Sequence, residues 1–238
     1  MLCGYIGALV LFAAPPAPTT TATPAAPPAP LREIVYTLSV NSRVERAYED
    51  FGAAPPDTRA DSGGYNGKMV IDVMQAASDG LLLHVTETTN AENGAKPVVG
   101  DLAVYNDGTV RAVGGDYDQS MTMLLPYFAT DWFGPNELQQ GNSWQANSTS
   151  ADKVDLVTNY LVAAVSGDVA TITSSTKPAT ANKSSLDIET KVLYKADLLV
   201  PLSLTIVVHQ MGDNTSSNNE AENTYHFDRV SDTRDPGK

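Results

Sequence analysis

Apolar and polar residues alternate with a period of two along most of this chain, which is the pattern of β-strands with one face in a hydrophobic core. The clearest example is the segment 186–195, where Leu, Ile, Thr, Val and Tyr at every second position alternate with Asp187, Glu189, Lys191 and other residues. The same alternation occurs in segments 34–40, 69–73, 81–85, 98–105, 109–113, 157–165, 169–174, 200–209 and 224–230. The pattern therefore predicts about ten strands.

Short turn sequences connect these segments. Ser78-Asp79-Gly80, Asn106-Asp107-Gly108 and Ser166-Gly167-Asp168 each stand between two alternating segments. Such residues supply the positive φ of tight hairpins, so consecutive strands are expected to be antiparallel. The sequence predicts an all-β, mainly antiparallel meander that forms a strongly curved sheet or half-barrel, a sandwich or a barrel. The polar segments 48–66 and 212–223 are predicted as loops.

Residues 118–133 depart from this alternation. Asp118 or Ser120 can cap the start of a helix there, and Pro126 interrupts one. The apolar residues with helical spacing are Met121, Leu124, Leu125 and Phe128. We expect a short, broken helical insert that covers the concave face or an edge of the sheet.

The N-terminal part differs in composition from the rest. Residues 1–14 contain an apolar run of about eleven residues, against the roughly 20 that span a bilayer as a helix. Residues 15–30 are rich in Ala, Pro and Thr, and Arg32 is the first charged residue. This predicts a signal-like segment, a disordered spacer and a single β domain over residues 31–238, exported to the periplasm, cell envelope or exterior of a bacterium. The alternative is a mildly apolar N-terminus with no targeting role.

Charge and cysteine content narrow the chemistry of the domain. The net charge of −13 falls entirely on residues 31–238, so polyanions such as nucleic acid are poor partners. Cys3 is the only cysteine. Disulfides, thiol catalysis and thiolate metal sites are therefore excluded in residues 31–238.

The sequence contains no complete motif for catalysis or metal binding. His84, His209 and His226 stand in separate predicted strands, without the spacing of metal ligands. The segment 141–145 lacks the second glycine of a nucleophile elbow. The acid-rich segment 213–222 has oxygen ligands but not the pattern of an EF-hand, which leaves calcium as an open hypothesis. We expect no catalytic residue, no metal site and no cofactor.

Three stretches are apolar on both faces of the predicted strands, namely 81–83, 198–200 and 204–208. A second surface then has to be kept from water. A fully packed two-layer sandwich would do this, and so would a cavity for an apolar ligand between the sheet and the insert. The residues that would line such a cavity are Leu83, Met121, Leu124, Leu125, Phe128, Trp132, Leu204 and Ile206.

An L-x-x-G-x-x-W segment, formed by Leu138, Gly141 and Trp144, follows the insert. With the Ala/Pro spacer, the meander and the central insert, the chain resembles uncharacterised exported bacterial envelope β-proteins. More distantly, it resembles the half-barrel lipoprotein-carrier and mycobacterial lipid-carrier group. The resemblance covers residues 31–230 as a layout, and implies a curved sheet that wraps apolar ligands beneath a helical lid. It transfers no catalytic residue.

These observations favour a non-enzymatic exported domain that binds a lipid or acyl chain. One alternative is an envelope scaffold or protein-interaction module with a solid core. The other is a hydrolase of an unrecognised type. None of these hypotheses includes a nucleic-acid partner or a transmembrane helix in the mature chain.

Overall fold

A computed structural model of the chain describes residues 29–48, 57–90, 96–131, 133, 138–149, 154–180, 185–214 and 217–235. The predicted signal-like segment 1–14 and most of the spacer 15–30 lie outside these residues. The strands are β1 (Arg32–Tyr48), β2 (Asp57–Ala77), β3 (Gly80–Thr89), β4 (Val98–Tyr105), β5 (Val110–Gly115), β6 (Ser143–Thr149), β7 (Asp155–Ser166), β8 (Val169–Pro178), β9 (Ser185–Lys195), β10 (Val200–Asn214) and β11 (Ser217–Asp232).

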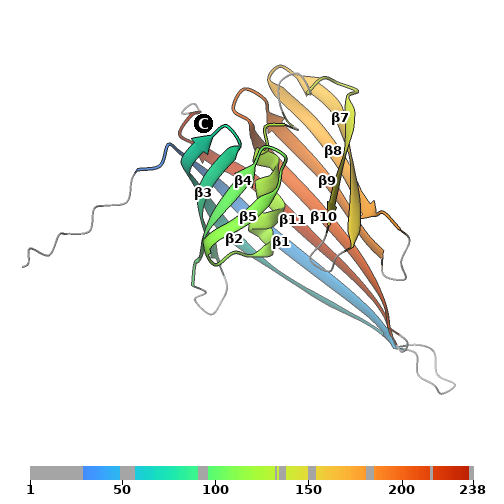
Figure 1. Ribbon diagram of the computed structural model, residues 1–238. Coiled ribbons are helices and arrows are strands. Elements are labelled where there is room, and N and C mark those ends of the chain that lie inside the picture. The colour runs from blue at the N-terminus through green and yellow to red at the C-terminus, as the bar shows by residue number, and fades with distance from the viewer. Residues whose placement is uncertain are drawn as a thin grey trace, which may run out of the picture.

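All eleven strands belong to one antiparallel sheet, in the order β5-β4-β3-β2-β1-β11-β10-β9-β8-β7-β6 (Figure 1). Its edges are β5 and β6, which do not pair with each other, so the sheet is curved but not closed. This confirms the predicted all-β antiparallel fold and decides for one curved sheet over a sandwich. Every pair of neighbours follows in sequence except β1 and β11, which join the two ends of the domain at the centre of the sheet.

Two polar segments expected as loops are largely strand, so that part of the prediction was wrong. β1 and β2 remain paired as far as Tyr48 and Asp57, and β10 and β11 as far as Asn214 and Ser217. These strands carry polar residues on both faces and therefore show no apolar alternation. Their backbone groups are nevertheless hydrogen-bonded within long hairpins, which extends the centre of the sheet beyond its arms.

The predicted insert is present as α1 (Gln119–Leu124) followed by η1 (Leu125–Phe128), a 3₁₀ turn. Asp118 caps α1, because its carboxylate accepts a hydrogen bond from the Met121 amide at 3.2 Å. Pro126 stands in the first turn of η1, where its missing N–H costs nothing. Among the described residues, no helix has the length and apolar character that a bilayer crossing requires.

The insert lies on the concave face of the sheet (Figure 1), where η1 contacts both β4 and β10. Inward side chains of the sheet pack against it. On β1, for example, Ile34 and Tyr36 are fully buried while Thr37 is exposed. In the described part of the chain, no second layer covers the outer face of the strands that are apolar on both faces, and Leu82 and Val207 there are only partly buried. One face of the sheet therefore carries the hydrophobic core.

Candidate functional site

The residues predicted to line a ligand cavity meet in one cluster between the sheet and the insert. Trp132 lies outside the described residues. The other seven are almost inaccessible, with exposed fractions of 0% for Leu83, Met121, Leu124, Leu125 and Leu204, 1% for Ile206 and 3% for Phe128. They belong to one packed core cluster. In this conformation the insert fills the space that the sequence assigned to a ligand.

Burial decreases along the concave face toward one end. A row of paired residues on β7 to β10 is 0% exposed: Val162, Ile172, Val192 and Leu204. Two rows further along, Thr158 and Thr176 are 9% and 8% exposed, and Ile188 is half-buried. Gln210, one row beyond, is exposed. We call this side, where the core reaches the surface, the open end.

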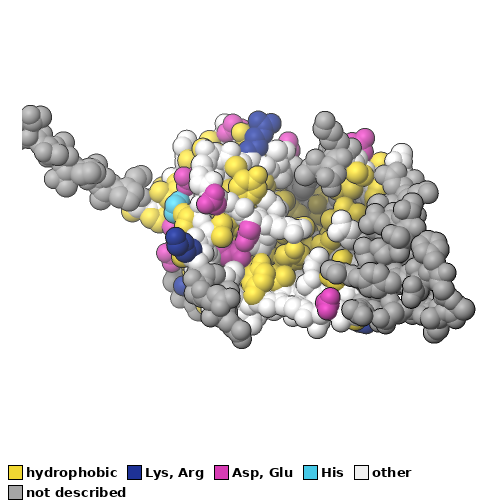
Figure 2. Space-filling model, turned by 90° about the horizontal axis from the view of Figure 1, so that it is seen from below, with side chains coloured by type: hydrophobic (Ala, Val, Ile, Leu, Met, Phe, Trp, Pro, Cys, Tyr) yellow, Lys and Arg dark blue, Asp and Glu magenta, His cyan; other side chains and the backbone are white. Residues whose placement is uncertain are grey.

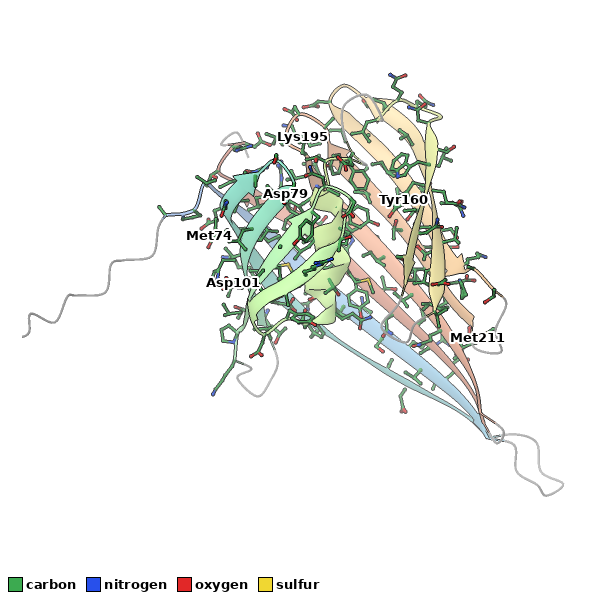
Figure 3. All side chains as sticks on the ribbon, viewed as in Figure 1. Met74, Asp79, Asp101, Tyr160, Lys195 and Met211 are labelled. Carbon is green, nitrogen blue, oxygen red and sulfur yellow. The ribbon has the colours of Figure 1, made fainter. Side chains whose placement is uncertain are left out.

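Figure 3 orients the two ends, with Lys195 at the upper end and Met211 at the lower, open end. Seen from below, the molecule has a recess whose walls carry apolar side chains (Figure 2). The partly buried side chains that pack against the core near this end include Tyr65, Met123, Leu186 and Ile188. An apolar groove that opens to solvent at one end is a common form of ligand site.

The upper end is closed by buried ion pairs. Arg32 donates to both oxygens of Asp232, from Nε at 2.9 Å and from Nη2 at 2.5 Å. Arg229 donates to the same carboxylate at 3.1 Å. Burial alone would raise the pKa of Asp232, but the hydrogen bond and charge of Arg32, with the charge of Arg229, lower it overall. These contacts fasten the start of β1 to the end of β11, opposite the open end.

A buried acidic group fastens the insert to β3. Glu87 is 1% exposed, and the Ser120 hydroxyl contacts both Glu87 Oε2 and Asp118 Oδ1. That hydroxyl has one proton, which it can donate to Glu87 or to Asp118. Burial raises the pKa of Glu87 to about 7, opposed by the Ser120 hydrogen bond and reinforced by Asp118. Ser120 therefore links the carboxyl groups of Glu87 and Asp118. We call these three residues the acid clasp.

The acid clasp makes the stability of the fold depend on pH. Glu87 retains its proton in the folded state up to about pH 7 but loses it near 4.5 when unfolded. The folded state binds more protons in this window, so we expect the free energy of unfolding to fall by up to about 3 kcal/mol as the pH rises from 4.5 to 7. Glu87→Gln should abolish this slope in urea denaturation measured across the window.

The matched control is Glu222→Gln, which removes an exposed carboxylate 3.4 Å from His209. Two tyrosines also face the clasp. Burial, Glu87 and Asp118 raise the pKa of Tyr65 to about 12, and burial and Asp118 raise the pKa of Tyr225, so neither titrates in the window. An unchanged slope in the Glu87 variant would show that another group carries the pH dependence.

Polar side chains interrupt the apolar concave face on β7 to β9, near the open end. Thr158 and Thr176 share a hydrogen bond of 2.8 Å between their hydroxyls, and Ser174 and Thr190 share one of 2.5 Å. The Tyr127 hydroxyl of η1 donates to Thr190 at 3.1 Å. We call these five residues the hydroxyl strip. These residues were not among the predicted site residues. Ser and Thr at inward positions of an alternating strand are the sequence feature that could have predicted them.

An aromatic group lies beside the hydroxyl strip. Trp144, on the edge strand β6, faces inward and stacks on Tyr160 with ring centroids 5.1 Å apart. Phe133 meets both rings edge to face, at centroid distances of 6.0 and 6.2 Å. The Trp144 indole nitrogen is buried and has no hydrogen-bond partner. An unpaired buried N–H is rare and costs stability, so its presence points to a partner that binds there.

The histidines lie away from this groove, on the outer face. His84 and His226 each lie beside one carboxylate, Asp101 at 2.7 Å and Asp228 at 2.8 Å respectively. In the described part of the chain no three His, Cys, Asp or Glu residues come together as a metal site. Most side chains of the acidic segment 213–222, the calcium hypothesis, lie outside the described residues.

Thr205, His226 and Asp228 form a hydroxyl–imidazole–carboxylate chain, with a Thr205–His226 distance of 2.9 Å. It lies on β10 and β11, which each pair with a strand on both sides. Their backbone amides point along the sheet toward neighbouring strands, so they are not available as an oxyanion hole above this chain. The arrangement does not support a hydrolase.

A second depression, of about 970 Å³, lies on the outer face of β6 to β10. Its side chains are largely polar, and include Gln145, Asn159, Glu189 and Lys191. Gln145 and Asn159 are already hydrogen-bonded to each other at 3.1 Å. Leu161 and Val207 also line this open depression, which lies on the other face of the sheet from the site that the sequence predicted.

No protein-family model matches this chain, and no curated protein shows significant sequence similarity to it. A proposal for the function of this chain therefore rests on the fold and on the geometry of the groove.

Proposed function

We propose that this protein is a non-enzymatic binding domain for a lipid or acyl chain, held between the curved sheet and the helical insert. The observation that supports the proposal is the concave face itself. It is apolar across neighbouring strands, closed by ion pairs at one end, open at the other, and covered by an insert of only six residues of α1 and four of η1.

Binding requires the insert to move, because its side chains occupy the groove in this conformation. An acyl chain gains about 0.8 kcal/mol for each methylene that it buries, so a long chain can replace the contacts that the insert gives up. The described polar ties of the insert to the sheet are few. They are the acid clasp at β3 and the hydrogen bonds of Tyr127 to Thr190 of β9 and Ser174 of β8. The insert therefore has the attachments of a lid.

Tyr127→Phe tests whether the insert acts as a lid, because it removes the hydrogen bond to Thr190 and keeps the aromatic ring. A neutral hydrogen bond contributes about 1 kcal/mol, so uptake of a fluorescent fatty acid should become about fivefold faster if opening of the insert limits the rate. Stopped-flow fluorescence measures this. Tyr117→Phe is the control, because Tyr117 is 55% exposed. An unchanged uptake rate in the Tyr127 variant would show that this hydrogen bond does not hold the lid.

We also propose that the protein works outside the cytoplasm of a bacterium, in the periplasm, cell envelope or medium. The support is the signal-like segment 1–14, the spacer 15–30 and the lack of cysteine beyond Cys3. The mass of the protein recovered from the envelope and medium of an expressing bacterium tests this. Loss of an N-terminal segment is expected, whereas an intact chain found only in the cytoplasm contradicts it.

A second function, a scaffold or protein-interaction module with a solid core, is favoured by one observation. The seven described lining residues are at most 3% exposed and leave no space among themselves. In that case the outer face and the loops would carry the function, and the concave face would serve only stability.

Native mass spectrometry of the full chain, produced with export in a bacterial host, separates these two functions. We expect a stoichiometric apolar adduct, which solvent extraction would release for identification. A protein that carries no adduct and takes up no fluorescent fatty acid after delipidation would instead be a scaffold, and pull-down from envelope extracts would then be the next step.

A further inference from the structure

We infer that the hydroxyl strip and Trp144 form a subsite for the oxygen-bearing head of the ligand, a carboxyl or ester group. The inference rests on the proposed function and adds to it the chemical class of the ligand and its orientation in the groove.

Part of the hydroxyl strip has more protons than its hydrogen bonds use. Thr158 and Thr176 have two hydroxyl protons and share one hydrogen bond. This pair therefore keeps one O–H for which the described residues supply no acceptor, whichever way the shared hydrogen bond runs. Tyr127 interacts with both Thr190 and Ser174, which also bond each other, so these three hydroxyls satisfy one another.

Trp144 adds a second donor in the same region. The pairing of the strands places Trp144 opposite Tyr160, Tyr160 opposite Ser174, and Ser174 opposite Thr190, so these side chains follow one row across β6 to β9. The Trp144 indole N–H is buried and has no partner. Thr158 and Thr176 occupy the next row toward the open end. Two spare donors on adjacent rows call for a ligand that supplies acceptors.

The surroundings decide which head group fits. A carboxylate or ester oxygen accepts hydrogen bonds from hydroxyl and indole groups, whereas an ammonium group only donates and an alkane does neither. The acid clasp, which would attract a cation, is on β3 in the opposite arm of the sheet.

The burial of the residues around the hydroxyl strip indicates how the ligand is oriented in the groove. Thr158, Ser174 and Thr176 are 8–9% exposed, while the residues one row deeper than Ser174 are 0% exposed. The head group therefore lies near the open end, and the acyl chain extends toward Leu124 and Leu204.

Competition against a bound fluorescent fatty acid tests the subsite on the full chain, with hexadecanoic acid, methyl hexadecanoate, hexadecane and hexadecylamine as competitors. We expect the acid and the ester to bind at least about tenfold more tightly than the alkane and the amine. Trp144→Phe, Ser174→Ala and Thr158→Val should each reduce this preference about three- to tenfold and leave alkane binding unchanged.

Two further variants control for folding and position. Thr158→Ser keeps the hydroxyl and should keep the preference, and Ser175→Ala changes the neighbouring residue of β8 on the outer face. Equal affinity for all four competitors, or a preference that survives the three inward variants, would overturn the subsite while the apolar site stands. If none of the four compounds binds, the proposed function fails and the subsite fails with it.

Discussion

Replacing Ile206 with aspartate is expected to leave the protein unfolded at neutral pH. Ile206 is 1% exposed on β10, in the cluster formed by the sheet and the insert. An unpaired carboxylate placed there costs several kcal/mol at least, in addition to the lost apolar burial, against a typical domain stability of about 5–15 kcal/mol. Circular dichroism should show no cooperative thermal transition for this variant.

Thr205→Asp is the matched control, since it introduces the same charge one position earlier on the outer face. There the carboxylate stands opposite Lys191 and beside His226, so the free energy of unfolding should change by less than about 1 kcal/mol. A stable Ile206 variant with weakened fatty-acid uptake would mean that the groove stands open to solvent in the folded state, which contradicts the packing in this structure.

Asp232→Ala is expected to cost about 3–5 kcal/mol of stability, because it leaves Arg32 and Arg229 buried without their shared carboxylate. The Asp232 side chain is 0% exposed and the two arginine side chains are 7% and 2% exposed. Their guanidinium groups therefore gain little hydration when the carboxylate is removed. Urea denaturation at neutral pH measures the loss.

Asp235→Ala is the control for this pair, because Asp235 also bonds Arg229, at 2.7 Å, but its side chain is 20% exposed. Its loss should cost about 1 kcal/mol or less. Equal effects of the two variants would show that burial at the upper end does not determine the strength of these ion pairs.

Local sequence patterns predict much of the fold. Alternation placed Leu83 and Ile206 on inward faces, and helical spacing with an aspartate cap located α1. These features depend on residues a few positions apart, so they can be read from the sequence. Alternation does not predict the polar ends of the long hairpins, because their pairing depends on the neighbouring strand rather than on side-chain type.

The parts of the site that carry its chemistry depend on distant residues. Ser120 meets Glu87 from 33 positions away, and Arg32 meets Asp232 from 200 positions away. The raised pKa of Glu87 comes mainly from burial under the insert, which its own neighbours in sequence do not reveal. The spare donors of the Thr158–Thr176 pair and of Trp144 likewise become visible only when β6 to β9 are in register.

The sequence by itself determined that this chain forms antiparallel strands around a short capped insert, and which faces of the strands are apolar, because side-chain direction follows from the period of a strand or helix. Only the tertiary structure decided that the sheet stays open, that the insert fills its concave face, and that acidic, basic and hydroxyl groups occupy separate parts of the groove. These features depend on how β1 and β11 pair and on how the sheet curves. Because the curvature is the sum of small twists over eleven strands, no single segment of the sequence determines it.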